Sequence, residues 1–190
     1  NGMGDGVLNN DSVLTSNISS VNDLHMYILS IADLTGIEDF TNLRSLILIN
    51  SQLTSIDVSN NLLLEELNLM NNQLTSIDLS NNINIIYLTL GSSQLTSVDL
   101  SNNIDLRNFT CYMSQLTSID LSNNLDLVSL SLSDNQLTSL DLSNNNQIAL
   151  LQVNQNQISN IDLSNLTLLH WFEGFGNQLS SLDVTNNTAL

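Results

Sequence analysis

Apolar residues recur along this chain in a pattern that returns every 21 positions. One copy of the pattern has its apolar positions at Leu64, Leu67, Leu69, Leu74, Ile77 and Leu79. The alternation Leu67-Asn68-Leu69 predicts a short strand, because successive side chains of a strand point to opposite faces. Ile77-Asp78-Leu79 has the same alternation, so each repeat should have two extended sides joined by tight corners.

The first of these strands can be followed through the chain in register. Its inward pairs are Leu24/Met26, Leu46/Leu48, Leu67/Leu69, Leu88/Leu90, Phe109/Cys111, Leu130/Leu132, Leu151/Val153 and Phe172/Gly174. Strands stacked coil upon coil form a parallel sheet with about 4.8 Å between neighbours, so the sheet should span roughly 35 Å. The pattern therefore predicts a solenoid of about eight coils over residues 21–190.

Asparagine pairs mark the corners of the predicted coil, at Asn60/Asn61, Asn81/Asn82, Asn102/Asn103, Asn123/Asn124 and Asn144/Asn145. Asparagine tolerates left-handed backbone angles, and its amide both donates and accepts hydrogen bonds. We expect these pairs to form the turns, and an inward column of amides to bond backbone groups from coil to coil.

The spacing Leu-x-x-Leu-x-Leu-x-x-Asn-x-Leu, read from Leu64 to Leu74, resembles the leucine-rich repeat family. The phrase Gln-Leu-Thr-Ser-Ile-Asp-Leu-Ser-Asn-Asn, with its 21-residue period, is similar to the repeats of internalin-J-type bacterial surface proteins. Gly4–Thr15 and Ile31–Phe40 resemble the opening of secreted flavobacterial repeat proteins. The resemblance implies parallel strands on a concave side, short extended or β segments opposite, and few or no α-helices in the repeats. The cysteine column of many such proteins is absent, since only Cys111 occupies that position.

The two ends of the chain give separate expectations. Residues 1–20 should be the remnant of an N-terminal cap, because the end of a solenoid buries its core poorly without one. Asn1-x-Met3-x-Asp5-Gly6 has a faint likeness to a calcium loop, but a plain turn is favoured because methionine offers no oxygen ligand. The chain stops just before the next strand is due, so we expect an open final coil and a natural protein that continues.

Charge restricts the class of partner. The net charge is −17, with 19 acidic residues against two basic ones, Arg44 and Arg107. This charge repels phosphate groups, so we expect no nucleic-acid partner. No apolar run approaches the roughly 18–20 residues of a membrane span, so we expect no membrane insertion.

A column of aspartates is the first candidate for chemistry. It consists of Asp57, Asp78, Asp99, Asp120, Asp141, Asp162 and Asp183. Neighbours about 5 Å apart would repel by about 0.8 kcal/mol in water, so something must offset the repulsion. The favoured interpretation is hydrogen bonding from nearby hydroxyls, such as Thr75, Ser76 and Ser80 around Asp78. The alternative is a calcium-binding stripe, although one column offers few of the oxygen ligands that calcium requires. We expect no cofactor, with calcium as the one open possibility.

Catalysis is not expected from this sequence. His25 and His170 fall near the first and last strands, roughly 30 Å apart, so they cannot share a site. Cys111 occupies an inward position and should be a small core residue. No glycine-rich phosphate loop, metal-ligand cluster or nucleophile elbow is present.

The outward positions of the first strand vary from coil to coil. The first column reads Asp23, Ser45, Glu66, Tyr87, Asn108, Ser129, Leu150 and Trp171. The second reads His25, Ile47, Asn68, Thr89, Thr110, Ser131, Gln152 and Glu173. The third reads Tyr27, Ile49, Met70, Gly91, Tyr112, Ser133, Asn154 and Phe175. Since folding does not dictate them, these positions are free for recognition.

Aromatic residues make up only 4% of the chain, and five of them fall in these columns. The candidate ligand-binding residues are Tyr87, Tyr112, Leu150, Gln152, Trp171, Glu173 and Phe175. Rings supply contact area and amides supply hydrogen bonds, which suits a protein or a glycan. Two alternatives are that the rings support packing between strands, or that the C-terminal group contacts material beyond residue 190.

The sequence thus favours a non-catalytic binding or adhesion module of a secreted or cell-surface bacterial protein. Its ligand would be a protein or a glycan, bound on the varied sheet face. Two other functions stay open: a passive spacer that displays another domain, and an accessory region of a larger secreted polysaccharide-degrading enzyme.

Overall fold

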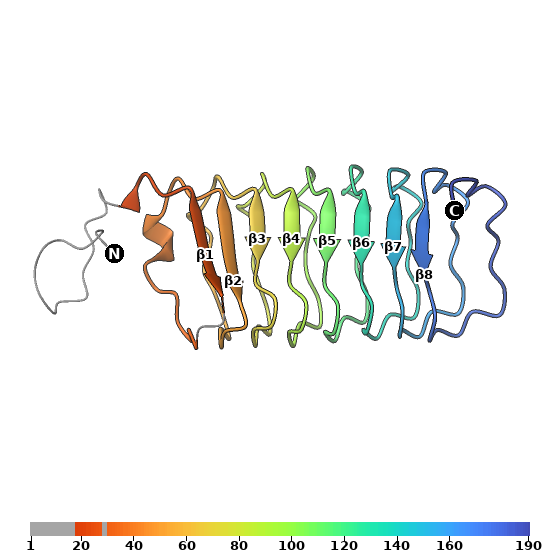
Figure 1. The fold of residues 1–190 in the computed structure, drawn as a ribbon, viewed down its shortest axis with the longest axis horizontal. Helices are drawn as coiled ribbons and strands as arrows, with labels where there is room; N and C mark the ends of the chain where they lie inside the picture. The colour runs from red at the N-terminus through yellow and green to blue at the C-terminus, as the bar shows by residue number, and fades with distance from the viewer. Residues whose placement is uncertain (1–17, 28–29) are drawn as a thin grey trace, which may run out of the picture.

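Eight short parallel strands lie side by side in one sheet that runs the length of the solenoid (Figure 1). The computed structural model describes residues 18–27 and 30–190. The strands are β1 Asp23–Tyr27, β2 Ser45–Ile49, β3 Glu66–Asn68, β4 Tyr87–Thr89, β5 Asn108–Thr110, β6 Ser129–Ser131, β7 Leu150–Gln152 and β8 Trp171–Glu173. A short 3-10 helix, η1, spans Ile37–Asp39. Spatial order follows sequence order, so the eight strands enclose seven complete turns.

The strand register confirms the predicted repeat. Leu24 pairs with Leu46, 22 positions on, and Leu46 pairs with Leu67, 21 positions on. From β3 the strands begin one residue earlier than the alternation predicts, at Glu66 rather than Leu67. The ladder still continues past the strand, because the Leu69 amide donates to the Thr89 carbonyl at 2.8 Å.

Inward side chains form one continuous core along the solenoid. The first inward position of β2 to β7 is at most 1% exposed. At β8, the Phe172 ring fills the space left by glycine at the next inward position, since a β-carbon on Gly174 would lie 2.6 Å from the Phe172 Cζ atom. Phe109 and Cys111 show the same combination of a large and a small residue, and both are fully buried. Burial raises the pKa of the Cys111 thiol to about 11, so the thiol is a protonated core group at neutral pH.

The opposite side of each coil is extended but does not form a second sheet within the described residues. Segments such as Ile77-Asp78-Leu79 contain no strand. Neighbouring coils are joined there by a recurring backbone bond, for example from the Gln94 amide to the Leu74 carbonyl at 2.8 Å. Side chains satisfy much of the remaining backbone, so a β-ladder is not required on this side.

The inward asparagine column is confirmed. Asn103 is 1% exposed, and its Nδ2 donates to the carbonyls of Leu79 at 3.3 Å and Asn82 at 2.9 Å. The preceding residue, Asn102, is exposed and donates to the Ser80 carbonyl at 3.1 Å. Equivalent inward bonds are made by Asn61, Asn82, Asn124, Asn145 and Asn187. At these positions an amide therefore ties its coil to the one before it, whereas Leu166 fills the inward position between Asn145 and Asn187 with an apolar side chain.

The asparagine pairs form turns, as expected, but the left-handed backbone angles lie elsewhere. From β2 onward, the left-handed residues follow the third outward position of the coil, at Asn50, Asn71, Ser92, Met113, Asp134, Gln155 and Gly176. The chain must turn sharply there, where the sheet ends. The asparagine pairs reach their turns through ordinary backbone angles, with bonds such as that from the Asn103 amide to the Leu100 carbonyl at 3.1 Å.

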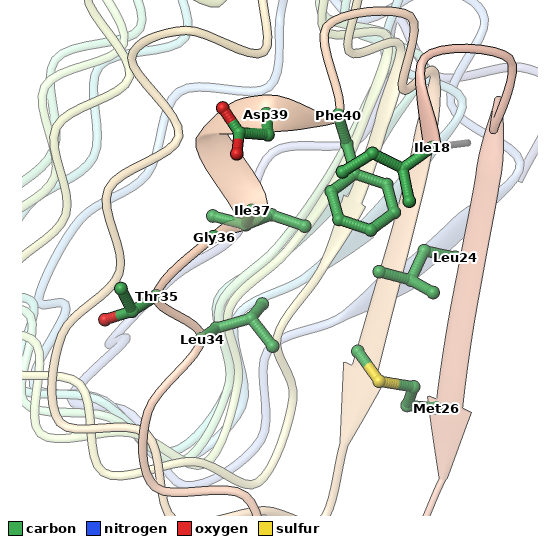
Figure 2. A pocket seen from close by; sticks show the side chains of 9 residues that line it. All are labelled: Ile18, Leu24, Met26, Leu34, Thr35, Gly36, Ile37, Asp39 and Phe40. Carbon is green, nitrogen blue, oxygen red and sulfur yellow. The ribbon is translucent and has the colours of Figure 1, made fainter. Parts of the chain in front are cut away.

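The N-terminal end of the core opens into an apolar cavity of about 300 Å³ (Figure 2). Leu24 and Met26 of β1 line it together with Ile37, Phe40 and Ile18. Ile18 is 4% exposed, so the last residues of the predicted 1–20 cap already cover part of the core. The rest of that predicted cap, residues 1–17, lies outside the described residues, and so does the Asn1–Gly6 loop.

Candidate functional site

Five of the seven candidate binding residues lie on the last two strands or directly after them. Leu150 pairs with Trp171 and Gln152 pairs with Glu173 in the β7–β8 register. Phe175 follows β8 on the same outward face, since Phe172 and Gly174 take the inward positions. We call Leu150, Gln152, Trp171, Glu173 and Phe175 the β7–β8 patch. Trp171 is 52% exposed and Phe175 is 64% exposed.

Glu173 is the centre of a hydrogen-bond network within the patch. Its Oε2 accepts from Gln152 Nε2 at 3.1 Å and from Asn154 Nδ2 at 2.6 Å. Its Oε1 accepts from the indole Nε1 of Trp171 at 2.9 Å. Three donors from two neighbouring coils thus hold one carboxylate, and the bond from Trp171 orients its ring.

These donors lower the pKa of the Glu173 carboxyl group. The hydrogen bond from Asn154 has the largest effect, followed by that from Trp171, while desolvation opposes both. A carboxylate that accepts several hydrogen bonds keeps its charge, so Glu173 is ionised at neutral pH.

Asn154 is a member of this site that the sequence did not single out. Its side chain is 6% exposed, and its Oδ1 accepts from the Phe175 amide at 3.2 Å. The Asn154 amide in turn donates to Ser133 Oγ at 3.2 Å. Asn154 therefore positions both Glu173 and the backbone of Phe175. Its place in the third outward column, one coil before Phe175, was the only signal in the sequence.

Tyr87 and Tyr112 lie apart from the β7–β8 patch. Tyr87 is on β4 and is 49% exposed. Tyr112 follows β5, and its hydroxyl donates to Met70 Sδ at 3.0 Å, two coils earlier. A β-carbon on Gly91 would lie 2.8 Å from Tyr112 Cδ1, so the ring covers that glycine. Tyr112 therefore packs across strands, as the alternative interpretation of the rings expected.

Each aspartate of the column bonds to its own turn. Asp99 Oδ1 accepts from the Ser101 backbone amide at 2.9 Å, and the same bond recurs at every member. The backbone and hydroxyl of Ser101 lower the Asp99 pKa, in that order of effect. Around Asp78 the donor is Ser80, as predicted, whereas the structure contains no bond to Asp78 from Thr75 or Ser76. Repulsion from Asp57 and Asp99 acts on Asp78 in the opposite direction.

Shallow cavities lie between neighbouring aspartates. One of about 220 Å³ is lined by Asp78, Ser80, Asp99 and Ser101. In the part of the chain that the structure describes, no three histidine, cysteine or carboxylate side chains are grouped to hold a metal ion. The hydrogen bonds thus explain how the column is stabilised, and the calcium-binding stripe stays an alternative hypothesis.

His25 and His170 are separated by the length of the sheet. His25 is on β1, and its Nε2 lies 2.8 Å from Ser45 Oγ, which donates to Glu66 Oε2 at 2.7 Å. Since the serine proton points to Glu66, the histidine does not activate this hydroxyl as a nucleophile. His170 is exposed beside β8. No helix among the described residues is long and apolar enough to span a membrane.

Comparison with solved structures places the fold among bacterial leucine-rich repeat solenoids. Internalin C2 of Listeria monocytogenes is 27% identical with a TM-score of 0.87, over 93% of this chain and 81% of that one. A leucine-rich repeat protein of Leptospira interrogans is 25% identical with a TM-score of 0.73, over 77% of this chain. The alignment spans only 41% of the Leptospira protein. Internalin F of Listeria monocytogenes is 25% identical with a TM-score of 0.51, over 94% of this chain and 75% of that one. No protein-family model matches the sequence, and no curated protein matches it.

Proposed function

We propose that this chain is a non-catalytic binding module that recognises a protein ligand through the outward face of the β1–β8 sheet. The main contact would be made by the β7–β8 patch, at the C-terminal end of that sheet. The observation that carries the proposal is the pair of exposed rings, Trp171 and Phe175, at varied positions of an otherwise regular solenoid. A regular coil does not need these rings, since the equivalent positions of other coils include small residues such as Ser129, Gly91 and Ser133.

The patch has the composition of a binding hot spot. Large aromatic side chains contribute most of the energy at many protein interfaces, and tryptophan is enriched among them. The Trp171 indole N–H already has a partner in Glu173, so what the ring offers to a ligand is apolar surface in a defined orientation. A side chain held in place before binding loses less entropy when the ligand arrives.

The contrast with Tyr112 supports this assignment. Tyr112 covers Gly91 and bonds to Met70, so its ring is used within the sheet. Phe175 is 64% exposed, and the hydrogen bonds around it act on its backbone rather than on its ring. Exposed apolar surface of this kind, rimmed by polar groups, is typical of an interaction site.

The solenoid architecture supports a binding role as well. Repeat proteins present extended surfaces built from one outward position per coil. The sequence resemblance to internalin-J-type and flavobacterial repeat proteins suggests a secreted or cell-surface location, which is part of this proposal.

The test is a binding screen against surface proteins and glycans with wild type and the Trp171→Ala/Phe175→Ala variant. We expect a protein ligand whose affinity falls at least about tenfold in the variant, a change of about 1.4 kcal/mol. The matched control is Ile83→Ala/Ile104→Ala, which removes two apolar side chains of similar exposure at the coil corners. A ligand that binds both variants as well as wild type would exclude the patch. A glycan ligand would correct the ligand class, and no ligand at all would favour the spacer function.

A further inference from the structure

Glu173 lies between two exposed aromatic residues along the chain. Trp171 precedes it by two positions on β8, and Phe175 follows it by two, in the turn directly after that strand. Alternate residues of a strand are about 6.6 Å apart, so Trp171 is the neighbour of Glu173 on the outward face of β8. With Phe175 just beyond the strand end, the three residues form a row in which a carboxylate is flanked by two rings. Both rings are more than half exposed.

The Glu173 carboxylate keeps unused acceptor capacity. An ionised carboxylate has about four lone-pair positions, and Gln152, Asn154 and Trp171 occupy three of them. Within the described residues, Oε1 accepts from Trp171 alone. A ligand donor can therefore reach this oxygen without breaking the network.

The two side-chain amides beside Glu173 are oriented toward its carboxylate. Gln152 Nε2 and Asn154 Nδ2 each donate one N–H to Glu173. What the row offers is a negative charge and two ring faces. That combination attracts a cation, because ring faces are electron-rich and the carboxylate supplies an opposite charge.

This chain has no lysine or arginine to pair with Glu173. Its two basic residues are Arg44, which pairs with Glu65, and Arg107, just before β5. Their coils are far along the sheet from β8. The net charge of −17 would also draw a positively charged partner toward the molecule.

We propose that the row Trp171, Glu173 and Phe175 binds a lysine or arginine side chain of the protein ligand, with the cation between the two rings and over the carboxylate. This inference rests on the proposed function and names the chemistry of the partner at the β7–β8 patch. It goes beyond a general contact surface, because it requires a charged group at one position.

Trp171 is the single tryptophan of the chain, so its fluorescence reports on this site directly. The probe is the capped tripeptide acetyl-Gly-Lys-Gly-amide, titrated into the intact protein, with the Nε-acetyl-lysine peptide as its uncharged match. We expect a saturable change in Trp171 emission in the millimolar range with the lysine peptide, and binding at least about tenfold weaker with the acetylated one. The corresponding arginine and citrulline peptides should behave in the same way.

Three variants, one of them a control, locate the effect and preserve the fluorescent reporter. Glu173→Gln should weaken lysine-peptide binding at least about tenfold. Glu66→Gln removes the same charge from the same sheet face at β3 and should leave binding unchanged. Phe175→Leu alters an exposed ring without touching the hydrogen bonds of Glu173, and should weaken binding by several-fold.

Several results would overturn the inference. They are equal binding of the charged and acetylated peptides, equal losses in Glu173→Gln and Glu66→Gln, or no emission change up to tens of millimolar lysine peptide. Each of these would leave the proposed function standing, since the Trp171→Ala/Phe175→Ala screen tests it without reference to charge. Conversely, a screen without any ligand would remove the proposed function even if the peptide binds.

Discussion

The ring of Tyr112 lies over Gly91, one coil earlier, so closely that a β-carbon on the glycine would be 2.8 Å from Tyr112 Cδ1. The Tyr112 hydroxyl reaches one coil further and donates to Met70 Sδ at 3.0 Å. Three consecutive coils are thus joined by one side chain on the outward face of the sheet. The absence of a side chain at residue 91 is what allows this contact.

Gly91→Ala should therefore destabilise the protein. The added methyl group displaces the Tyr112 ring and breaks its contact with Met70, at a cost of about 1–3 kcal/mol. Chemical denaturation measures the change. The control is the double variant Gly91→Ala/Tyr112→Ser, which places at residue 112 the serine found one coil later at Ser133. If alanine costs as much in the Tyr112→Ser background as in wild type, the two residues are not coupled and this account is wrong.

Asn103→Ala should lower the free energy of unfolding by about 2–4 kcal/mol, because it leaves the buried carbonyls of Leu79 and Asn82 without their amide donor. Asn102→Ala is the neighbouring control. It removes one exposed bond, to the Ser80 carbonyl, and should cost less than about 1 kcal/mol. Similar losses of unfolding free energy at both positions would show that burial of the amide does not decide how much it contributes to stability.

Acid should destabilise the fold through the aspartate column. Hydrogen bonds from each turn lower the pKa of members such as Asp99 below the ordinary value of 3.8. A carboxyl group with a lowered folded-state pKa contributes stability above its unfolded pKa and loses that contribution as the pH falls through the folded value. The free energy of unfolding should therefore be level near neutral pH and fall as the pH drops through about 4 and below.

Asp99→Asn tests whether the aspartate column causes this loss of stability at low pH. The amide oxygen can still accept from Ser101, but the group no longer titrates, so the loss of stability between about pH 5 and pH 3 should be smaller. Asp126→Asn removes the same charge outside the column and controls for net charge. Urea unfolding across this range is the measurement. If the free energy of unfolding depends on pH in the same way in both variants, the loss of stability at low pH comes from overall charge instead.

Calcium should leave the melting temperature unchanged at millimolar concentration. One oxygen of each aspartate, Oδ1, already has a donor in its own turn, and the described residues hold no group of three metal-binding side chains. Thermal melts with chelator, with calcium and with magnesium check this. A saturable rise with calcium that disappears in Asp99→Asn/Asp120→Asn would establish the cation stripe instead.

Much of the candidate site follows from the alternation of the sequence. The pairings of Leu150 with Trp171 and of Gln152 with Glu173 were predictable, because a coil of constant length brings equivalent positions into register. The role of Asn154 was not predictable. Its contact with Glu173 joins residues 19 positions apart, and the repeat shows only that both side chains are outward.

The left-handed residues illustrate a second limit. Asn50, Asn71 and Asp134 are of the residue types that favour positive φ. Met113 and Gln155 have no such preference, so the local signal marks only part of that column. Hydrogen bonds to both neighbouring coils offset the strain of this turn. The Met113 amide donates to the Ser133 carbonyl at 3.0 Å, and the Tyr112 carbonyl accepts from the Ser92 amide at 2.7 Å. Local preference would have assigned these angles to the asparagine pairs.

The sequence by itself determined the solenoid, its coil length, its strand register, its inward leucines and amides, and the face on which variation occurs. It could do so because burying one apolar stripe at a constant period permits only one stacking. Tertiary structure decided how the varied side chains use that face. Tyr112 turns back over Gly91, while Trp171 and Glu173 bond to each other and leave the indole ring exposed. These contacts depend on which side chains of neighbouring coils lie next to each other, and a repeat pattern carries no information about contacts between varied side chains.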